Sequence, residues 1–294
     1  MVWGTPDAEV HIDEALLAGL LADQHPDLAR LPVRLIDAGW DNSMFRLGDA
    51  LSVRMPRRQI AVALLANEQR WLPDMADVLP LPVPALIRPG APGRGYPWAW
   101  SILPWLDGIA ADQEPPAPTE APRLAAFLTV LHQPAPLQAP ANPGRGVPLI
   151  ERDEVLQARL ERLRTRTSLI GGEIDSLWRR ALAATPATDR LWLHGDLHAR
   201  NILVKDGAFS GVIDWGDITA GDPATDLAAV WGLFEDAGAR DKALAAYGPN
   251  EALIARAKGW AVLFGAMLLD SGLVDNPRHA AMGAATLRRV AADG

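Results

Sequence analysis

The chain has 294 residues, of which 49% are hydrophobic, and carries a formal net charge of -8. This length and composition suffice for one large domain or two lobes with a sizeable core. A nucleic-acid-binding protein would carry a basic stripe, and this sequence has none. The absence of cysteine excludes disulfides, iron–sulfur clusters and thiolate zinc sites, and it fits a cytoplasmic protein.

Neither targeting nor membrane insertion is expected from the apolar pattern. Residues 1–7 contain no basic patch and no apolar core, so they do not resemble a signal peptide. The longest apolar run lies near residues 260–269, whereas a bilayer span needs about twenty apolar residues. We therefore expect a buried helix there, and neither a membrane nor a nucleic acid as partner.

Residues 1–105 predict a small lobe of antiparallel strands with one helix packed on them. The predicted elements are a helix over 13–24, strands over 32–38, 43–47 and 51–55, a helix from residue 59 that Pro73 should end or kink, and strands over 82–88 and 98–103.

Residues 106–294 predict a larger, mainly helical lobe. Nine prolines between residues 113 and 148 indicate a rigid connector that contains one short helix. The further predicted helices cover 150–169, 173–185, 223–236, 250–269 and 277–292. Together the two regions predict an α+β fold with a β-rich amino-terminal lobe.

The segment 191–214 interrupts the helices and brings three polar side chains together. An apolar strand over 191–193 leads into a polar loop, and a hairpin of two strands returns to Asp214. This arrangement places Asp196, Asn201 and Asp214 at one mouth of the hairpin. The three side chains are therefore candidates for a common site.

Phosphoryl transfer needs these residue types. One carboxylate orients the attacking hydroxyl and accepts its proton, while an amide oxygen and a second carboxylate hold magnesium. The spacing agrees with the kinase template: His, one residue, Asp, four residues, Asn, then an Asp after another strand. We predict Asp196 as the catalytic base, and Asn201 and Asp214 as the magnesium ligands.

Three spaced motifs resemble the aminoglycoside phosphotransferase family, relatives of the protein kinases. They are His194-Gly195-Asp196-Leu197-His198 with Asn201, Val212-Ile213-Asp214-Trp215-Gly216-Asp217, and Gly221-Asp222-Pro223-Ala224-Thr225-Asp226-Leu227-Ala228. The resemblance covers most of the chain and is sharpest over 191–228. It implies a bilobal protein-kinase-like fold and transfer of the γ-phosphate of ATP or GTP to an alcohol group. It also matches Asp226 to a buried acid that braces the catalytic loop.

Some polar residues near these motifs have a simpler interpretation. We expect Asp217, Asp222 and Asp226 to be structural acids in loops and helix caps. His194 and His198 stand four residues apart, as metal-binding pairs do, but that arrangement needs a helix and this stretch is predicted to be a loop. We expect them to orient the loop by hydrogen bonds.

The sequence contains no P-loop motif for binding the phosphates of a nucleotide. Asn42 and Ser43 belong to a predicted turn over residues 39–43 that occupies the place of the kinase phosphate loop, and their side chains and backbone amides could face phosphate. Arg54 stands where kinases carry a strand lysine, and Glu68 on the next helix is its predicted partner.

The base of the nucleotide is expected at the connector over residues 102–107. There the backbone around Leu103 and Trp105 would bind adenine or guanine, so the sequence does not separate ATP from GTP.

The acceptor is not identified by the sequence. An acidic wall would favour a polycationic aminoglycoside, and its candidates are Asp217, Glu235, Asp236, Asp241, Asp270 and Asp275. The eleven tryptophans could instead form an apolar pocket, as a macrolide would need. Two alternatives stay open: a metal-dependent hydrolase using His194, Asp196 and His198, and a non-catalytic nucleotide-binding module of kinase fold. All three chemistry-bearing residues are present, which argues against the second.

Overall fold

The computed structural model describes residues 6–294, so residues 1–5 of the stretch examined for a signal peptide lie outside it. Within the described residues the chain forms two units. The smaller comprises 6–78 and 82–107, and the larger comprises 79–81 and 108–294. The predicted division between residues 105 and 106 lies two residues before the junction at 107 and 108.

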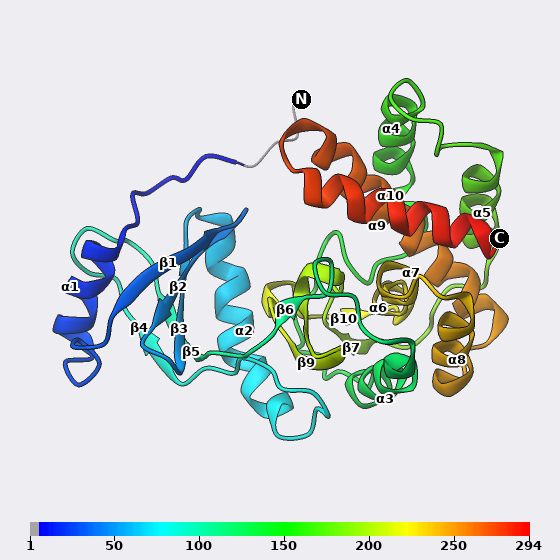
Figure 1. The fold of residues 1–294 in the computed structure, drawn as a ribbon. Helices are drawn as coiled ribbons and strands as arrows, with labels where there is room; N and C mark the ends of the chain where they lie inside the picture. The colour runs from blue at the N-terminus through cyan, green and yellow to red at the C-terminus, as the bar shows by residue number, and fades with distance from the viewer. Residues whose placement is uncertain (1–5) are drawn as a thin grey trace. The chain divides into compact units, whose positions relative to one another are not determined.

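The smaller unit contains a five-stranded antiparallel sheet with the order β1-β2-β3-β5-β4 (Figure 1). Its strands are β1 Val33–Ala38, β2 Asn42–Leu47, β3 Leu51–Pro56, β4 Arg88–Gly90 and β5 Trp100–Pro104. The first three match the predicted strands. The strand predicted over 82–88 is wrong, since β4 begins only at Arg88. Pro82 and Pro84 explain this difference, because neither can donate to a ladder.

Two helices pack on this sheet: α1 Glu14–Gln24, whose N-cap is Asp13, and α2 Ile60–Ala76. The buried leucines of α1 share a core with Phe45 and Val53. Successive residues of a strand face opposite sides, so Arg54 points away from that core and reaches the helix α2. The expected end or kink at Pro73 did not cut the helix short: α2 runs on to Ala76.

The larger unit is mainly helical, as predicted. Its helices are α3 Ala121–Leu131, α4 Asp153–Arg164, α5 Gly172–Ala183, α6 Ala224–Leu227, α7 Ala229–Leu233, α8 Ala237–Tyr247, α9 Glu251–Asp275 and α10 Pro277–Ala292. The single helix predicted over 223–236 is wrong, because the chain forms the two short helices α6 and α7 there. The helix α8 was not predicted. Its buried face consists of Ala239, Arg240 and Ala243, which give little apolar periodicity.

Two small antiparallel groups of strands hold the loop 194–201, which carries the proposed catalytic base, in the larger unit. The strand β7 Leu191–Leu193 pairs with β10 Thr219–Gly221, and β8 Ile202–Lys205 lies between β6 Ile109–Ala110 and β9 Ala208–Val212. The loop 194–201 therefore connects two different pairings. This fixes both of its ends.

The helix α9 forms the centre of the larger unit and packs along α10 (Figure 1). It is long and apolar enough to cross a bilayer by length and composition, but 56% of its most apolar window is buried within the protein. Trp260, Leu263 and Ala266 are among its fully buried residues. It is therefore the buried helix that the sequence predicted, as found in the core of globular proteins.

Candidate active site

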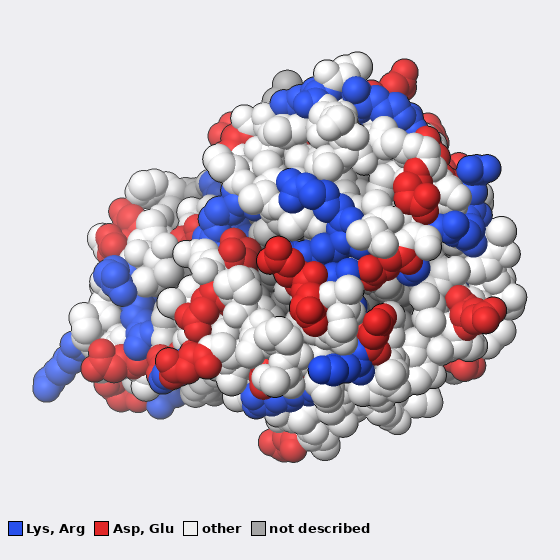
Figure 2. Space-filling view, turned by 45° about the vertical axis from the view of Figure 1, so that its right-hand side comes forward, with Lys and Arg blue, Asp and Glu red and all other residues white. Residues whose placement is uncertain are grey.

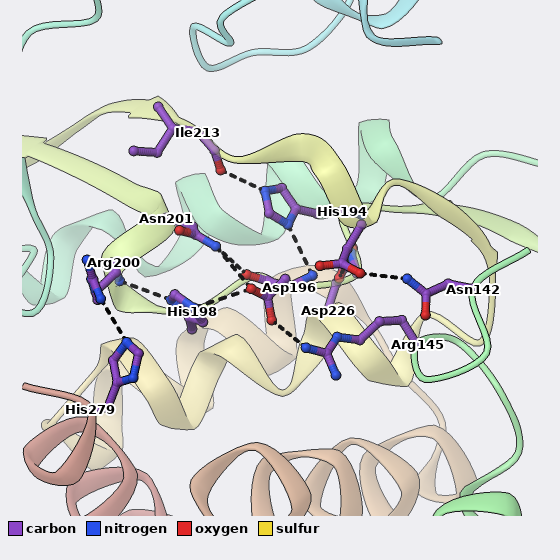
Figure 3. Close-up of polar contacts among 12 residues, drawn as sticks. Asn142, Arg145, His194, Asp196, His198, Arg200, Asn201, Ile213, Asp226 and His279 are labelled. Carbon is purple, nitrogen blue, oxygen red and sulfur yellow. Dashed lines mark hydrogen bonds and ion pairs between the residues drawn. The ribbon is translucent and has the colours of Figure 1, made fainter. Parts of the chain in front are cut away.

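His194 holds the loop 194–201 through both nitrogens of its ring (Figure 3). Its ring is fully buried and lies 4.7 Å from the ring of Trp215. Its Nδ1 atom accepts the N–H of Asp196 at 3.2 Å, which leaves Nε2–H to donate to the carbonyl of Ile213 at 3.0 Å. Both ring nitrogens are used, so His194 has no nitrogen left for a metal. The predicted role in orienting the loop is confirmed.

Asp226 binds the same loop through its backbone. Its carboxylate is fully buried and accepts the N–H of His194 at 2.7 Å and that of Gly195 at 2.9 Å. The resemblance implied this bracing role, and these contacts confirm it. Gly195 itself has a φ of +85°, and a Cβ there would lie 2.4 Å from the carbonyl oxygen of Asp217. Only glycine fits this close approach.

Asp196 projects from the loop and has three polar neighbours. Its Oδ1 accepts from Arg145 Nη2 at 2.9 Å, while its Oδ2 lies 3.4 Å from both His198 Nε2 and Asn201 Nδ2. Burial alone would raise the pKa of Asp196, but the charges of His198 and Arg145 outweigh it and hold that pKa below its usual range. The carboxylate is therefore ionised at neutral pH.

Asn201 is held against Asp196 by its amide nitrogen, which also donates to the backbone carbonyl of Asp196 at 2.9 Å. The side-chain oxygen consequently points away from Asp196 (Figure 3). An amide oxygen is a suitable magnesium ligand. The orientation of Asn201 therefore fits its predicted role.

Asp214 follows β9 and is brought to the loop by its neighbour. Ile213 donates its N–H to the carbonyl of Asn201 at 2.9 Å and accepts from His194. Asp214 is exposed and has a φ of +62°, which is uncommon for a residue other than glycine. Such backbone conformations concentrate at functional sites. The carboxylate of Asp214 and the amide of Asn201 both offer the oxygen atoms that magnesium prefers as ligands, and their joint role stays a prediction.

Two of the acids interpreted as structural do have structural partners. Asp217 accepts from Asn142 Nδ2 at 2.6 Å. Its pKa is raised, first by burial and then by the negative charges of Asp196 and Asp214. Asp222 forms a buried ion pair with Arg256 at 2.6 Å.

In the smaller unit, Arg54 and Glu68 form the predicted ion pair. The distance from Arg54 Nη1 to Glu68 Oε2 is 2.5 Å, and both side chains are buried. The pair joins β3 to α2 and holds the guanidinium in one place. Its contact with nucleotide phosphates stays a prediction.

Asn42 and Ser43, predicted as the end of the phosphate turn, are instead the first two residues of β2, so the turn itself is shorter than predicted. Two arginines that the sequence analysis did not single out hold this turn. Arg57 Nη1 donates to the carbonyl of Gly39 at 2.6 Å, and Arg58 binds the carboxylate of Asp41 at 2.5 Å. Consecutive arginines after a strand carry no motif, so only the folded turn reveals their role.

The connector residues Leu103 and Trp105 are more engaged than expected. Leu103 is buried in β5. The N–H of Trp105 donates to the carbonyl of Ala50 at 2.8 Å, and the guanidinium carbon of Arg46 lies 3.8 Å from the centre of its ring. The N–H of Trp105 is therefore used within the protein and is not available to a nucleotide base. The role of Leu103 and Trp105 in binding the base stays a prediction.

Known proteins share this motif set and this architecture. A profile of the phosphotransferase enzyme family matches residues 32–260, which is most of the chain. The chain belongs to this family. The predicted phosphotransferase is thus confirmed at the level of the family, and the three motifs lie within the matched range.

Solved structures of the family confirm the kinase-like fold. The GDP complex of an aminoglycoside 2'-phosphotransferase-IIIa has a TM-score of 0.70 and 17% identity, over 96% of this chain and 99% of that one. A macrolide 2'-phosphotransferase of type I has a TM-score of 0.60 and 22% identity, over 96% and 99% of the two chains. At these identities the likeness shows the fold alone.

A curated relative matches over a short stretch. The viomycin phosphotransferase of Streptomyces vinaceus is 46% identical over 54 residues. This alignment covers 17% of the chain and 19% of the relative.

Proposed function

We propose that this phosphotransferase-family protein transfers the γ-phosphate of ATP or GTP to a hydroxyl of a small molecule. The observation that carries the proposal is the arrangement of Asp196, Asn201 and Asp214 around one loop. The carboxylate is kept ionised, the amide oxygen is turned outward, and the second carboxylate is held in an uncommon backbone conformation. A general base and an oxygen donor set are the two parts that phosphoryl transfer requires.

Asp196 acts on the acceptor. Its ionised carboxylate accepts a hydrogen bond from the acceptor hydroxyl, orients it, and takes its proton as the new bond to phosphorus forms. The bracing contacts from Asp226 and His194 keep the loop in place, so little reorganisation is needed during the reaction.

Asn201 and Asp214 would hold magnesium, which neutralises charge on the phosphate oxygens when it is bound. Arg54 would bind the nucleotide phosphates, with Glu68 fixing its orientation. Asn42, Ser43, Leu103 and Trp105 complete the proposed nucleotide contacts.

The names of similar proteins support a nucleotide donor and a small acceptor. One neighbour was solved with GDP and kanamycin, and another with ADP. Other relatives are named for macrolides and viomycin. An antibiotic or a related hydroxyl-bearing metabolite is therefore the proposed acceptor class. Basic and acidic side chains lie in neighbouring clusters on the face shown in Figure 2.

The test is a phosphorylation assay over hydroxyl-bearing antibiotics and metabolites, with ATP or GTP and with or without magnesium. Phosphorylated products would be identified by mass spectrometry and ³¹P NMR. Asp196→Asn should lower turnover by about a hundred- to ten-thousand-fold while nucleotide binding survives. Asp206→Asn is the matched control, because Asp206 is an exposed carboxylate in the turn between β8 and β9.

Turnover of Asp196→Asn within a few-fold of the control would remove Asp196 from this role. Nucleotide binding without any phosphorylated product over the whole panel would favour the non-catalytic module. Activity that requires a transition metal and no triphosphate would favour the hydrolase.

A further inference from the structure

Four arginines lie close enough for their charges to interact, and one of them, Arg145, contacts Asp196. Arg145 lies in the loop between α3 and α4, and Arg152 ends the short 3-10 helix Leu149–Arg152 that leads into α4. Arg159 and Arg162 lie on α4 itself. The predicted wall of the acceptor site consisted of acids, so this basic group differs from the prediction.

Two of these arginines already have a carboxylate partner. Asp270 is buried in α9 and accepts from Arg159 Nη1 at 3.1 Å and from Arg162 Nη2 at 2.6 Å. Asp270 was a candidate for binding a polycationic acceptor. Its charge is instead neutralised within the protein.

Arg145 links the basic group to the proposed catalytic base. It contacts Oδ1 of Asp196, whereas the proposed magnesium ligand Asn201 contacts Oδ2 (Figure 3). The arginine therefore approaches Asp196 from the side away from Asn201. Its guanidinium carbon also lies 5.0 Å from the centre of the Phe264 ring, and its Nε is buried without a hydrogen-bond partner.

Arg152 is the cation that lacks a counterion. Among the described residues no hydrogen bond or ion pair satisfies it, and its Nε is buried without an acceptor. Its guanidinium carbon lies 3.9 Å from where a Cβ on Gly144 would be, so it rests against the loop that carries Arg145. Burial and then the charge of Arg145 lower the pKa of Arg152, and the exposed Glu151 offsets this only in part.

We propose that Arg152 and Arg145 form a binding site for an oxyanion, a carboxylate or a phosphate group, carried by the acceptor near its reactive hydroxyl. This inference rests on the proposed function and names the substrate class of the same site. Guanidinium groups suit such anions, because their N–H groups match two oxygens at once. An anion there supplies the missing acceptor for Arg152.

The same anion competes with Asp196 for Arg145. When the acceptor binds, Arg145 gains a second carboxylate or phosphate partner, and Oδ1 of Asp196 becomes available to the hydroxyl. A polycation would instead bring further positive charge towards Arg152, where like charges already repel. The site therefore selects against the polycationic acceptors that an acidic wall would have favoured.

Binding can be tested without any knowledge of the acceptor. In full-length protein labelled with ¹⁵N-arginine, the Nε–H signals would be followed by NMR during titration with inorganic phosphate and, separately, with acetate at constant ionic strength. Arg152→Met and Arg145→Met would assign the two signals. We expect saturable shifts of both, and at least a tenfold weaker response of Arg145 in Arg152→Met.

Arg164→Met is the matched control, because Arg164 lies on α4, is exposed, and pairs with Asp175. It should leave the anion affinity as in the wild type. The proposal is overturned if the Arg152 signal does not saturate by about 10 mM anion, which is affinity too weak for a specific site. It is also overturned if Arg152→Met and Arg164→Met behave alike.

A second experiment compares acceptors by their kcat/KM for phosphorylation. Each hydroxy acid is paired with its primary amide, which lacks the negative charge, and kanamycin serves as the polycationic acceptor. Wild type should show at least a tenfold higher kcat/KM for the acid, and Arg152→Met should bring this ratio close to one. Equal use of acid and amide, or a preference for kanamycin, overturns the inference while leaving the proposed function intact. If anions bind at Arg152 but no acceptor is phosphorylated, the proposed function is overturned and the anion site itself is not.

Discussion

Asp226 should be the residue whose conservative replacement does the greatest damage to the catalytic loop. Asp226→Asn keeps the size of the side chain but leaves one oxygen where the carboxylate has two. Oδ2 accepts from His194 and Oδ1 from Gly195, at 2.7 and 2.9 Å, and the side chain is fully buried. The new amide NH2 must therefore face one of these two N–H donors.

The cost follows from the two contacts. Losing a hydrogen bond to a charged group costs about 1.5–3 kcal/mol, and leaving a buried N–H without an acceptor costs about 1–3 kcal/mol. We expect Asp226→Asn to lower the free energy of unfolding by about 3 kcal/mol. A shift of the loop moves Asp196, two residues from His194, so the phosphorylation rate should fall by about a hundredfold.

Urea denaturation monitored by circular dichroism would measure the free energy of unfolding. The phosphorylation rate would be measured under conditions in which the variant is fully folded. The control is Asp236→Asn, because Asp236 caps the amino terminus of α8 by accepting the N–H of Ala239 at 2.7 Å. Asparagine caps helices as well as aspartate, so this variant should change stability by a few tenths of a kcal/mol. A similar small loss in Asp226→Asn would refute the bracing role.

Three further predictions concern the proposed magnesium ligands, the ion pair between Arg54 and Glu68, and the buried His279. Asp214→Ala should abolish magnesium-dependent nucleotide binding in calorimetry, while Asn201→Ala should be milder because water can replace a neutral ligand; unchanged affinity in Asp214→Ala would contradict the metal assignment. Arg54→Ala should raise the nucleotide KM. Glu68→Ala should raise that KM little further once Arg54 is gone. Additive effects of the two substitutions in a double-mutant cycle would show that the pair does not act as a unit. Burial and neighbouring positive charges lower the pKa of His279 to about 4. As pH falls below about 6.5, the unfolded chain binds this proton before the folded protein does, so this group should lower the free energy of unfolding by about 3 kcal/mol between pH 7 and pH 4. His279→Gln should flatten that dependence in urea titrations, and an unchanged slope would argue against it.

Patterns of neighbouring residues in the sequence were enough to predict some strands and the loop 194–201. Alternating apolar residues marked β2 and β3, and polar residues after a short apolar strand marked the catalytic loop. The three motifs placed Asp196, Asn201 and Asp214 in one segment, where a single hairpin brings them together. The spacing of these three residues could predict the site, because the loop 194–201 and the hairpin that follows it are nearly continuous in the chain.

Elements whose signals are weak or misleading were decided by packing. The helix α2 runs past Pro73, where the buried Leu72 anchors its last turn. The short strand β4 forms only where the prolines before it end. The helix α8 buries alanines, which carry little periodicity. For α2 and α8, tertiary contacts outweigh local propensity, whereas the late start of β4 follows from the prolines themselves.

The environment of the proposed base was likewise decided by tertiary structure alone. Arg145 stands 51 residues before Asp196, in a proline- and glycine-rich stretch that predicts only a connector. No spacing rule links an arginine there to a carboxylate in a later loop. Only the folded chain brings Arg145 to Asp196 and leaves Arg152 without a counterion, because charge interactions depend on distance in space and not on separation along the chain.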